Sequence, residues 1–148
     1  MKTLHIICGP MGFGKTHLRH RLFSHMPCVD ILTYQYHQPS SKIGILRTYI
    51  RCLSEVLIQL ELHDEVCLEH TLLKRFRRAS LLKRLPKDVR RVYHVPMPSK
   101  DAFTQVNLPK RVDLKYWKGY YEEALEVFDM PDPSLEQVDE LHIYKGAP

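Results

Sequence analysis

The sequence predicts an α/β fold in which a parallel sheet of about five strands is covered by helices on both faces. Short apolar segments alternate with longer segments whose apolar residues recur every three or four positions, as strands and helices do in such folds. The first apolar segment runs directly into a glycine-rich loop, residues 9–16, and a helical segment follows. The chain has 148 residues, 44% of them hydrophobic, and it is expected to form a single domain over residues 1–148.

Five short apolar segments are expected to form the strands. Their side chains are mostly apolar and turn or loop residues bound them, which is typical of strands buried in a parallel sheet. They cover residues 3–8, 29–32, 66–68, 89–95 and 141–144. Ligands bind at the carboxyl ends of the strands in such sheets. Functional residues are therefore expected in four places: the loop at 9–16, the loop at 34–42, the Glu69-His70-Thr71 turn and the segment after Val95.

Four helices are expected from the spacing of apolar residues. The first runs from the glycine-rich loop to about His25 and carries Leu18, Leu22 and Met26 on its apolar face. The second is the longest, and its core face is expected to consist of Ile43, Leu46, Ile50, Leu53, Leu57 and Leu60.

The third and fourth helices are also predicted to be amphipathic. The apolar face of the third is expected to consist of Leu72, Phe76, Ala79 and Leu82, while its other side carries Lys74, Arg77 and Arg78. The fourth has an apolar stripe of Leu114, Trp117, Tyr121, Leu125 and Phe128. Because Trp117 and Tyr121 share this stripe, we expect both rings to pack in the core.

The glycine-rich loop reads GPMGFGKT and matches the phosphate-binding pattern G-x-x-x-x-G-K-[ST] at Gly9, Gly14, Lys15 and Thr16. The glycines allow backbone N–H groups to curl around an anion. Lys15 has the length to reach the β- and γ-phosphates, and the Thr16 hydroxyl is a ligand for Mg²⁺. The helix that begins here directs its positive end at the same phosphates.

This motif, with a strand before it and a helix after it, predicts a three-layer P-loop NTPase fold. The expected ligands are ATP and Mg²⁺, with Thr16 holding the metal. The residues expected to bind the nucleotide are Gly9, Pro10, Met11, Gly12, Phe13, Gly14, Lys15, Thr16 and His17.

The composition narrows the class of partner. The formal net charge is +5, and the positive charge concentrates between Lys74 and Arg91. A polyanion such as nucleic acid and a solvated basic helix face explain this equally well. No apolar run approaches the length of a membrane span, and the N-terminus is strand-like rather than a signal peptide. We therefore expect no membrane partner, a cytoplasmic location (the host cytoplasm for a viral protein) and reduced cysteines.

Five residues outside the loop are candidates for the chemistry. Glu69 ends a strand, where P-loop proteins often keep an acid for Mg²⁺, water or a substrate hydroxyl. His37 lies in the loop at 34–42, and an unperturbed histidine, with a pKa of about 6.5, suits a general base; a surface histidine is the alternative. Lys110 and Arg111 lie in an irregular stretch, a candidate lid at about 96–112, which also contains Lys100. A cation there is suited to closing over the transferred phosphoryl group.

The order of these features resembles the small P-loop kinases of the bacteriophage polynucleotide kinase type, including phage DNA-modification kinases. The resemblance rests on GPMGFGKT, on VCLEHTLLKRFRRASLL (66–82), on VYHVPMPSKDAF (92–103) and on the C-terminal helix, proline break and final strand. It implies ATP-dependent transfer of the γ-phosphate to a hydroxyl, often on a nucleic acid. Lys15 and Thr16 carry over directly, and Glu69 stands where the family usually has an aspartate.

Two features depart from that family. The segment after the second strand reads TYQYHQ and lacks the family's aspartate general base, while Asp30 falls early in the expected strand. The lid segment 103–108 reads FTQVNL and lacks arginine, which leaves Lys110 and Arg111 as candidate cations.

The leading interpretation is a kinase that uses Mg·ATP and phosphorylates a hydroxyl on a nucleic acid or nucleotide, with DNA the expected acceptor. A 5′-hydroxyl end and a hydroxymethylated base are both compatible with it. The candidate catalytic residues are Lys15, Glu69, His37 and Arg111. Two alternatives stay open: a kinase of small metabolites, and an ATP-binding module without turnover. The protein is expected to be a monomer or a small homo-oligomer.

Overall fold

The computed structural model describes residues 1–31, 42–100 and 117–146. Its centre is a parallel sheet in the order β2-β3-β1-β4-β5. The strands are β1 (Thr3–Ile7), β2 (Cys28–Asp30), β3 (Glu65–Glu69), β4 (Arg90–Met97) and β5 (Glu140–Lys145). The predicted five-stranded parallel sheet is therefore confirmed, with strand bounds that differ from the expected ones by a few residues.

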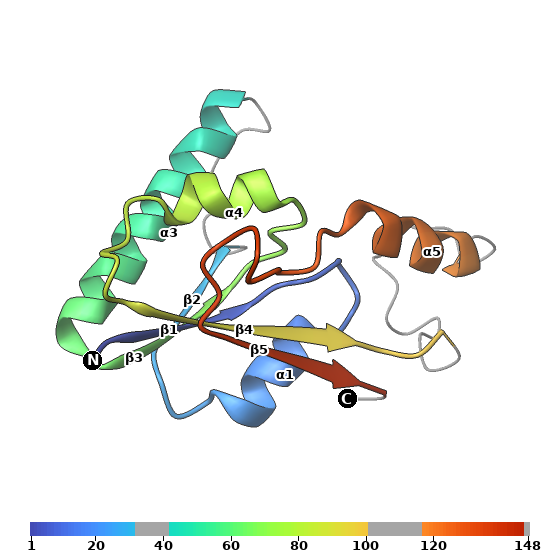
Figure 1. Ribbon diagram of the computed structural model, residues 1–148, viewed down its shortest axis with the longest axis horizontal. Helices are drawn as coiled ribbons and strands as arrows, with labels where there is room; N and C mark the ends of the chain where they lie inside the picture. The colour runs from blue at the N-terminus through green and yellow to red at the C-terminus, as the bar shows by residue number, and fades with distance from the viewer. Residues whose placement is uncertain (32–41, 101–116, 147–148) are drawn as a thin grey trace.

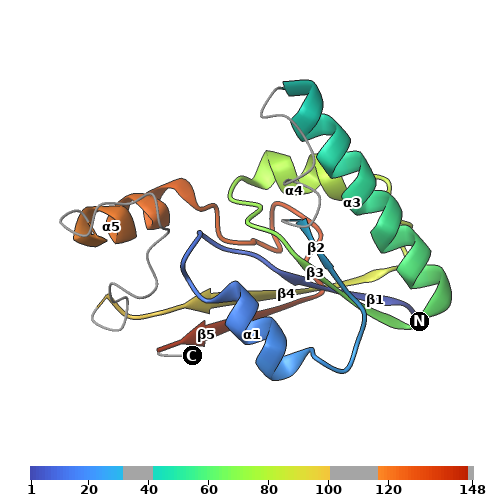
Figure 2. The ribbon, with the colours of Figure 1, turned by 180° about the vertical axis from the view of Figure 1, so that it is seen from behind.

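Helices cover both faces of this sheet, as Figures 1 and 2 show. Helix α1 (Lys15–Leu22) lies on one face, and α3 (Lys42–Leu62) and α4 (Arg75–Leu82) lie on the other. Helix α5 (Trp117–Val127) lies beyond the carboxyl ends of the strands. The larger core fills the space under α3 and α4, while a smaller one, with Ile7, Leu18 and Phe23, lies under α1.

The strand register brings distant segments to one edge of the sheet. The last residue of β1, Ile7, is paired with Glu69 on β3 and with His94 on β4. Glu69 is paired in turn with Asp30, the last residue of β2. The glycine-rich loop leaves β1 at this edge, so Glu69 and Asp30 end beside it.

The predicted apolar face of α4 is only partly confirmed, because Leu72 and Leu82 are buried but the two residues between them are not. Phe76 is 64% exposed and Ala79 is also exposed, whereas Arg78 is only 1% exposed. Helix α4 begins at Arg75, so Leu72 belongs to the loop before it and helical spacing cannot be counted from that residue. The side that packs on the sheet is instead Arg78, Leu81 and Leu82, because Glu136 neutralises the guanidinium.

The predicted core face of α3 is only half right. Leu53 and Leu60 are buried, but Ile43, Leu46 and Ile50 are 64%, 58% and 45% exposed. The first turns of α3 project away from the sheet, as Figure 1 shows, so the sheet does not cover these three side chains. The buried side is shifted toward Gly44, Thr48, Cys52 and Val56, which follow one another at intervals of four residues.

Helix α1 ends at Leu22, so the expected extension to His25 is too long, and Met26 packs on the α1-side core from the following turn. All four cysteines are free thiols, and Cys8, Cys52 and Cys67 are buried. Within the described ranges, no helix is long and apolar enough to span a bilayer.

Candidate nucleotide-binding site

The glycine-rich loop has the backbone shape that its sequence predicts. Gly9, Gly12 and Gly14 have φ values of 148°, 82° and 96°, in the region that favours glycine over other residues. The loop is anchored at its base, where the Gly9 N–H donates to the Thr71 carbonyl at 3.0 Å. Gly14 is the N-cap of α1, and its carbonyl accepts the Leu18 N–H at 2.9 Å. The amino end of α1, with its partial positive charge, therefore opens directly from the loop.

Lys15 folds back over this loop. Its Nζ donates to the carbonyls of Gly9 and Pro10, each at 2.9 Å. Burial lowers the pKa of Lys15 to about 8, and the charge of Glu69 acts in the opposite direction. A phosphate oxygen is a stronger acceptor for an ammonium group than a carbonyl. The contacts of Lys15 are thus ones that a bound phosphate can replace.

Thr16 and Glu69 form the second part of the site. The Thr16 hydroxyl donates to Glu69 Oε2 at 2.9 Å, which joins α1 to the end of β3. Burial and the neighbouring charge of Asp30 raise the pKa of Glu69. The buried Glu69 Oε1 has no hydrogen-bond partner among the described residues. Hydroxyl and carboxylate oxygens are the kind of ligand that Mg²⁺ takes, so these two side chains fit the expected metal.

Arg19 and Asp30 belong to the same site, although sequence reasoning assigned neither to it. Arg19 Nη1 lies 3.1 Å from Asp30 Oδ2 and 3.5 Å from Glu69 Oε1. Asp30 is the last residue of β2, not an early residue of a longer strand as expected. One signal was present in the sequence, because Arg19 follows Lys15 by four residues and therefore shares its side of α1.

His70 follows Glu69 and is held as a neutral imidazole. The Leu72 N–H donates to its Nδ1 at 3.1 Å, so Nε2 carries the proton. This Nε2 is buried and has no hydrogen-bond partner in the described part of the chain. Burial lowers the pKa of His70 to about 3, and the charge of Lys15 adds to this. Its ring stacks on Tyr49 of α3, with centroids 5.4 Å apart.

Helix α5 holds the outer side of the loop. The buried ring of Phe13 stacks on Tyr121 with centroids 5.5 Å apart, which confirms the expected core position of Tyr121. The Tyr120 hydroxyl donates to the Met11 carbonyl at 2.6 Å. The Tyr121 hydroxyl donates to the Pro98 carbonyl at 2.8 Å. A segment more than 100 residues away in the sequence therefore braces the loop; the side chain of Trp117 lies outside the described part.

A pocket of about 280 Å³ adjoins the loop on the α1 side of the sheet. The loop contributes Phe13 and Gly14 to it, and the ends of β4 and β5 contribute Met97 and Tyr144. Helix α1 contributes the cation Arg21 to the lining of this pocket. This pocket has the mixed aromatic and apolar walls that suit a flat ring beside the phosphate loop.

Several expected site residues lie outside the described residues, among them His37, Lys110, Arg111 and most of the candidate lid. Lys100, at its described beginning, forms an ion pair with Glu122 of α5. His17 is exposed on α1. In the described ranges no group of three or more histidine, cysteine or acidic side chains is arranged to hold a metal ion. A magnesium ion here would therefore depend on Thr16, Glu69 and oxygens of the nucleotide.

No protein-family model and no curated protein matches the sequence. Solved structures do resemble it. A gluconokinase from Sinorhizobium meliloti 1021 has a TM-score of 0.59 at 15% identity, over 99% of this chain and 83% of that one. A shikimate kinase from Acinetobacter baumannii has a TM-score of 0.52 at 16% identity, over 96% of this chain and 83% of that one.

A chain of the Pnkp1/Rnl/Hen1 RNA repair complex has a TM-score of 0.61 at 14% identity. The match covers 91% of this chain and 51% of that one, so the protein corresponds to about half of the larger chain. At sequence identities this low, the matches show a similarity of fold only. Together with the sheet order and the glycine loop on β1, they show that the protein has the three-layer α/β P-loop fold.

Proposed function

We propose that the protein is a kinase that transfers the γ-phosphate of Mg·ATP to a hydroxyl group. One observation carries this proposal: the glycine loop with Lys15, the Thr16–Glu69 pair and Asp30 meet at the carboxyl edge of the sheet. The likeness to a gluconokinase, a shikimate kinase and a chain of an RNA repair complex supports the same class.

The donor side of the site is assigned to the loop and α1. The loop N–H groups and the amino end of α1 bind the phosphates, and Lys15 turns from the Gly9 and Pro10 carbonyls to the β- and γ-phosphates. Thr16 and Glu69 hold the magnesium ion, which neutralises charge on the transferred group when it is bound. The adenine base of ATP lies in the pocket between Phe13 and Tyr144. The ends of β4 and β5 complete this pocket.

The acceptor side is assigned to Asp30, with His37 as the competing residue. Asp30 is half-buried at the end of β2, opposite Glu69, and Arg19 fixes its carboxylate. It is therefore placed to orient a hydroxyl toward the phosphates, and a general base contributes typically 10²- to 10⁴-fold to a rate. Arg111 remains the proposed cation that closes over the phosphoryl group. Since positioning and charge account for most of the acceleration in phosphoryl transfer, Lys15 is the residue whose loss should matter most.

The proposed acceptor is a nucleic acid, with DNA as the leading candidate. The likeness to a gluconokinase favours a second candidate, a small hydroxylated metabolite. Both differ from an ATP-binding module, because such a module transfers no phosphate to any acceptor.

A transfer assay with γ-labelled ATP tests the proposal. The acceptors are single-stranded and duplex DNA, RNA, DNA with hydroxymethylated bases, nucleosides and sugars. Lys15→Met should abolish labelling, whereas the control Lys2→Met, at an exposed lysine paired with Asp64, should leave it unchanged. Asp30→Asn should lower the rate at least tenfold if Asp30 is the base, and His37→Gln should do so if His37 is. If wild-type protein binds ATP and labels no acceptor, or if Lys15→Met labels normally, the proposed kinase is refuted.

A further inference from the structure

We propose that the groove between α3 and α4 binds the strand of a single-stranded polynucleotide acceptor, leading its hydroxyl to the site beside Glu69. This inference rests on the proposed kinase function and deepens it, since it selects a polynucleotide over a small metabolite as the acceptor.

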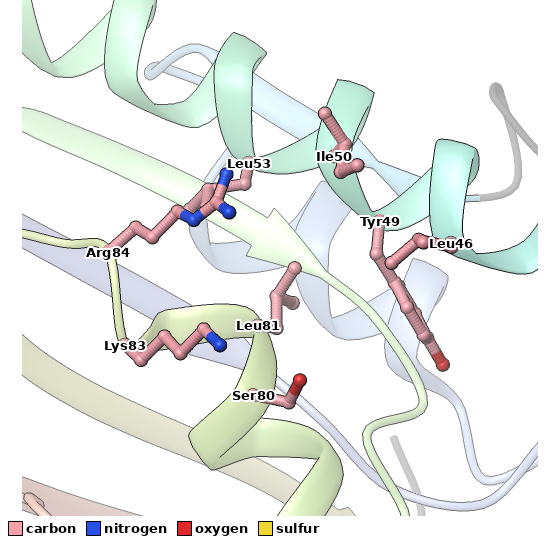
Figure 3. A pocket seen from close by; sticks show the side chains of 8 residues that line it. All are labelled: Leu46, Tyr49, Ile50, Leu53, Ser80, Leu81, Lys83 and Arg84. Atoms are coloured by element: carbon pink, nitrogen blue, oxygen red, sulfur yellow. The ribbon is translucent and has the colours of Figure 1, made fainter.

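The groove has one apolar wall and one cationic wall (Figure 3). Its volume is about 200 Å³. Leu46 and Ile50 of α3 line the first wall and are among the exposed apolar residues of that helix. Lys83 and Arg84, just after α4, line the second. A ligand that fills such a groove has an apolar part and an anionic part side by side, as a nucleotide does.

The two cations of the groove differ from two of the arginines on α4. Arg75 and Arg78 are both paired with Glu136. Lys83 and Arg84 are exposed, and in the described part of the chain neither forms an ion pair or a hydrogen bond. Among the described residues, none that lines the groove carries a carboxylate. Some cations of the basic segment at 74–91 are therefore neutralised within the fold, whereas the charges of Lys83 and Arg84 are available to bind phosphates.

Two stacked rings connect the groove to the proposed catalytic edge. Tyr49 lines the groove and stacks on His70, and His70 directly follows Glu69. The buried Nε2–H of His70 is a donor without a partner among the described residues, which marks this link between groove and site as polar. Aromatic and apolar side chains beside cations are the features by which proteins hold single strands with little sequence preference.

A small metabolite would not extend from the catalytic edge into this groove. Its hydroxyl and its remaining polar groups would all be held near Glu69, Asp30 and the loop. An acidic protein segment would also complement the charge of Lys83 and Arg84. It would not explain why contacts from Tyr49 through His70 connect the groove to Glu69. That continuity favours the substrate of the same site over a separate protein partner.

The groove can be tested by the binding of fluorescent single-stranded DNA, measured by anisotropy at several salt concentrations. The groove variant is Lys83→Glu with Arg84→Glu. The control is Arg51→Glu with Lys87→Glu, which alters the net charge equally at exposed positions outside the groove. The groove variant should lose at least tenfold in affinity, and the slope of log affinity against log salt should become shallower by about 1.4, since each contact with a single strand contributes about 0.7.

The control should lose less than threefold in DNA affinity, and both variants should bind ATP as the wild type does. Equal DNA affinity of groove variant and control overturns the inference, even if the protein is an active kinase. Labelling of a sugar or nucleoside but of no oligonucleotide overturns it as well. Binding of polyglutamate, but not DNA, with the same sensitivity would identify a protein partner and also overturn it. The anisotropy assay measures DNA binding without turnover and tests only the groove. The transfer assay tests the kinase proposal separately.

Discussion

The Arg78–Glu136 pair is expected to be the most important charge interaction for stability. Arg78 is 1% exposed, and its Nε and Nη2 donate to Glu136 at 2.8 and 2.7 Å, while Nη1 donates to the Leu72 carbonyl. Glu136→Ala leaves this guanidinium buried without its counter-charge. Breaking a buried pair in this way costs about 3–5 kcal/mol. That loss is a large part of the roughly 5–15 kcal/mol that stabilises a typical domain.

The matched control is the exposed pair Arg90–Glu140. Its closest N–O distance is also 2.7 Å, but both side chains are more than 40% exposed. Exposed pairs contribute about 0–1 kcal/mol, so Glu140→Ala should change stability little. Urea unfolding of the two variants, followed by circular dichroism without nucleotide, compares a buried pair with an exposed pair that has the same closest N–O distance.

A double variant separates the pair from its surroundings. Arg78→Met with Glu136→Leu removes both charges, and buried ion pairs replaced by apolar residues are often neutral or more stable. The double variant should therefore be more stable than Glu136→Ala alone. Equal losses in Glu136→Ala and Glu140→Ala would refute the reasoning, because they would show that burial of Arg78 does not set the cost.

Two further predictions concern proton binding. Burial lowers the pKa of both His70 and His94 to about 3, so both are neutral in the folded protein while the unfolded chain binds protons below about pH 6.5. Stability should therefore be greatest above pH 6.5 and fall by about 1 kcal/mol per histidine between pH 7 and 5.5, as urea unfolding at each pH would measure; constant stability over that range would contradict it. Lys15, whose pKa burial lowers to about 8, should regain its full charge beside ATP phosphates. Calorimetry at pH 8.5 in two buffers of different ionisation enthalpy should then show uptake of about 0.7 proton on ATP binding; identical heats in the two buffers would rule it out.

Some features of the protein follow from short stretches of sequence. The glycine loop requires positive φ at Gly12 and Gly14 and a helix after them, and each requirement is met within eight residues. Apolar strands need burial on both faces, so alternation of strands with helices predicts the parallel sheet. Glu69 was placed correctly at a strand end because the strand itself is apolar.

Other features depend on contacts between distant residues. The pattern of α4 suggested a solvent-facing Arg78, but Glu136, 58 residues further along, makes its burial possible. The pattern of α3 predicted one continuous core face, yet a stripe is buried only where a sheet lies beneath it.

The sequence by itself determined where a phosphate is expected to bind, because a loop conformation is a local property of the backbone. The tertiary structure decided what surrounds that phosphate. It ended β2 at Asp30 opposite Glu69, joined Asp30 to Arg19, and braced the loop with Tyr120 of α5. It also left Lys83 and Arg84 without an ion pair among the described residues, in a groove, while Glu136 neutralises Arg78. Pairing and burial of charges are set by the whole fold, and periodicity along one helix carries no information about the partner that lies across from it.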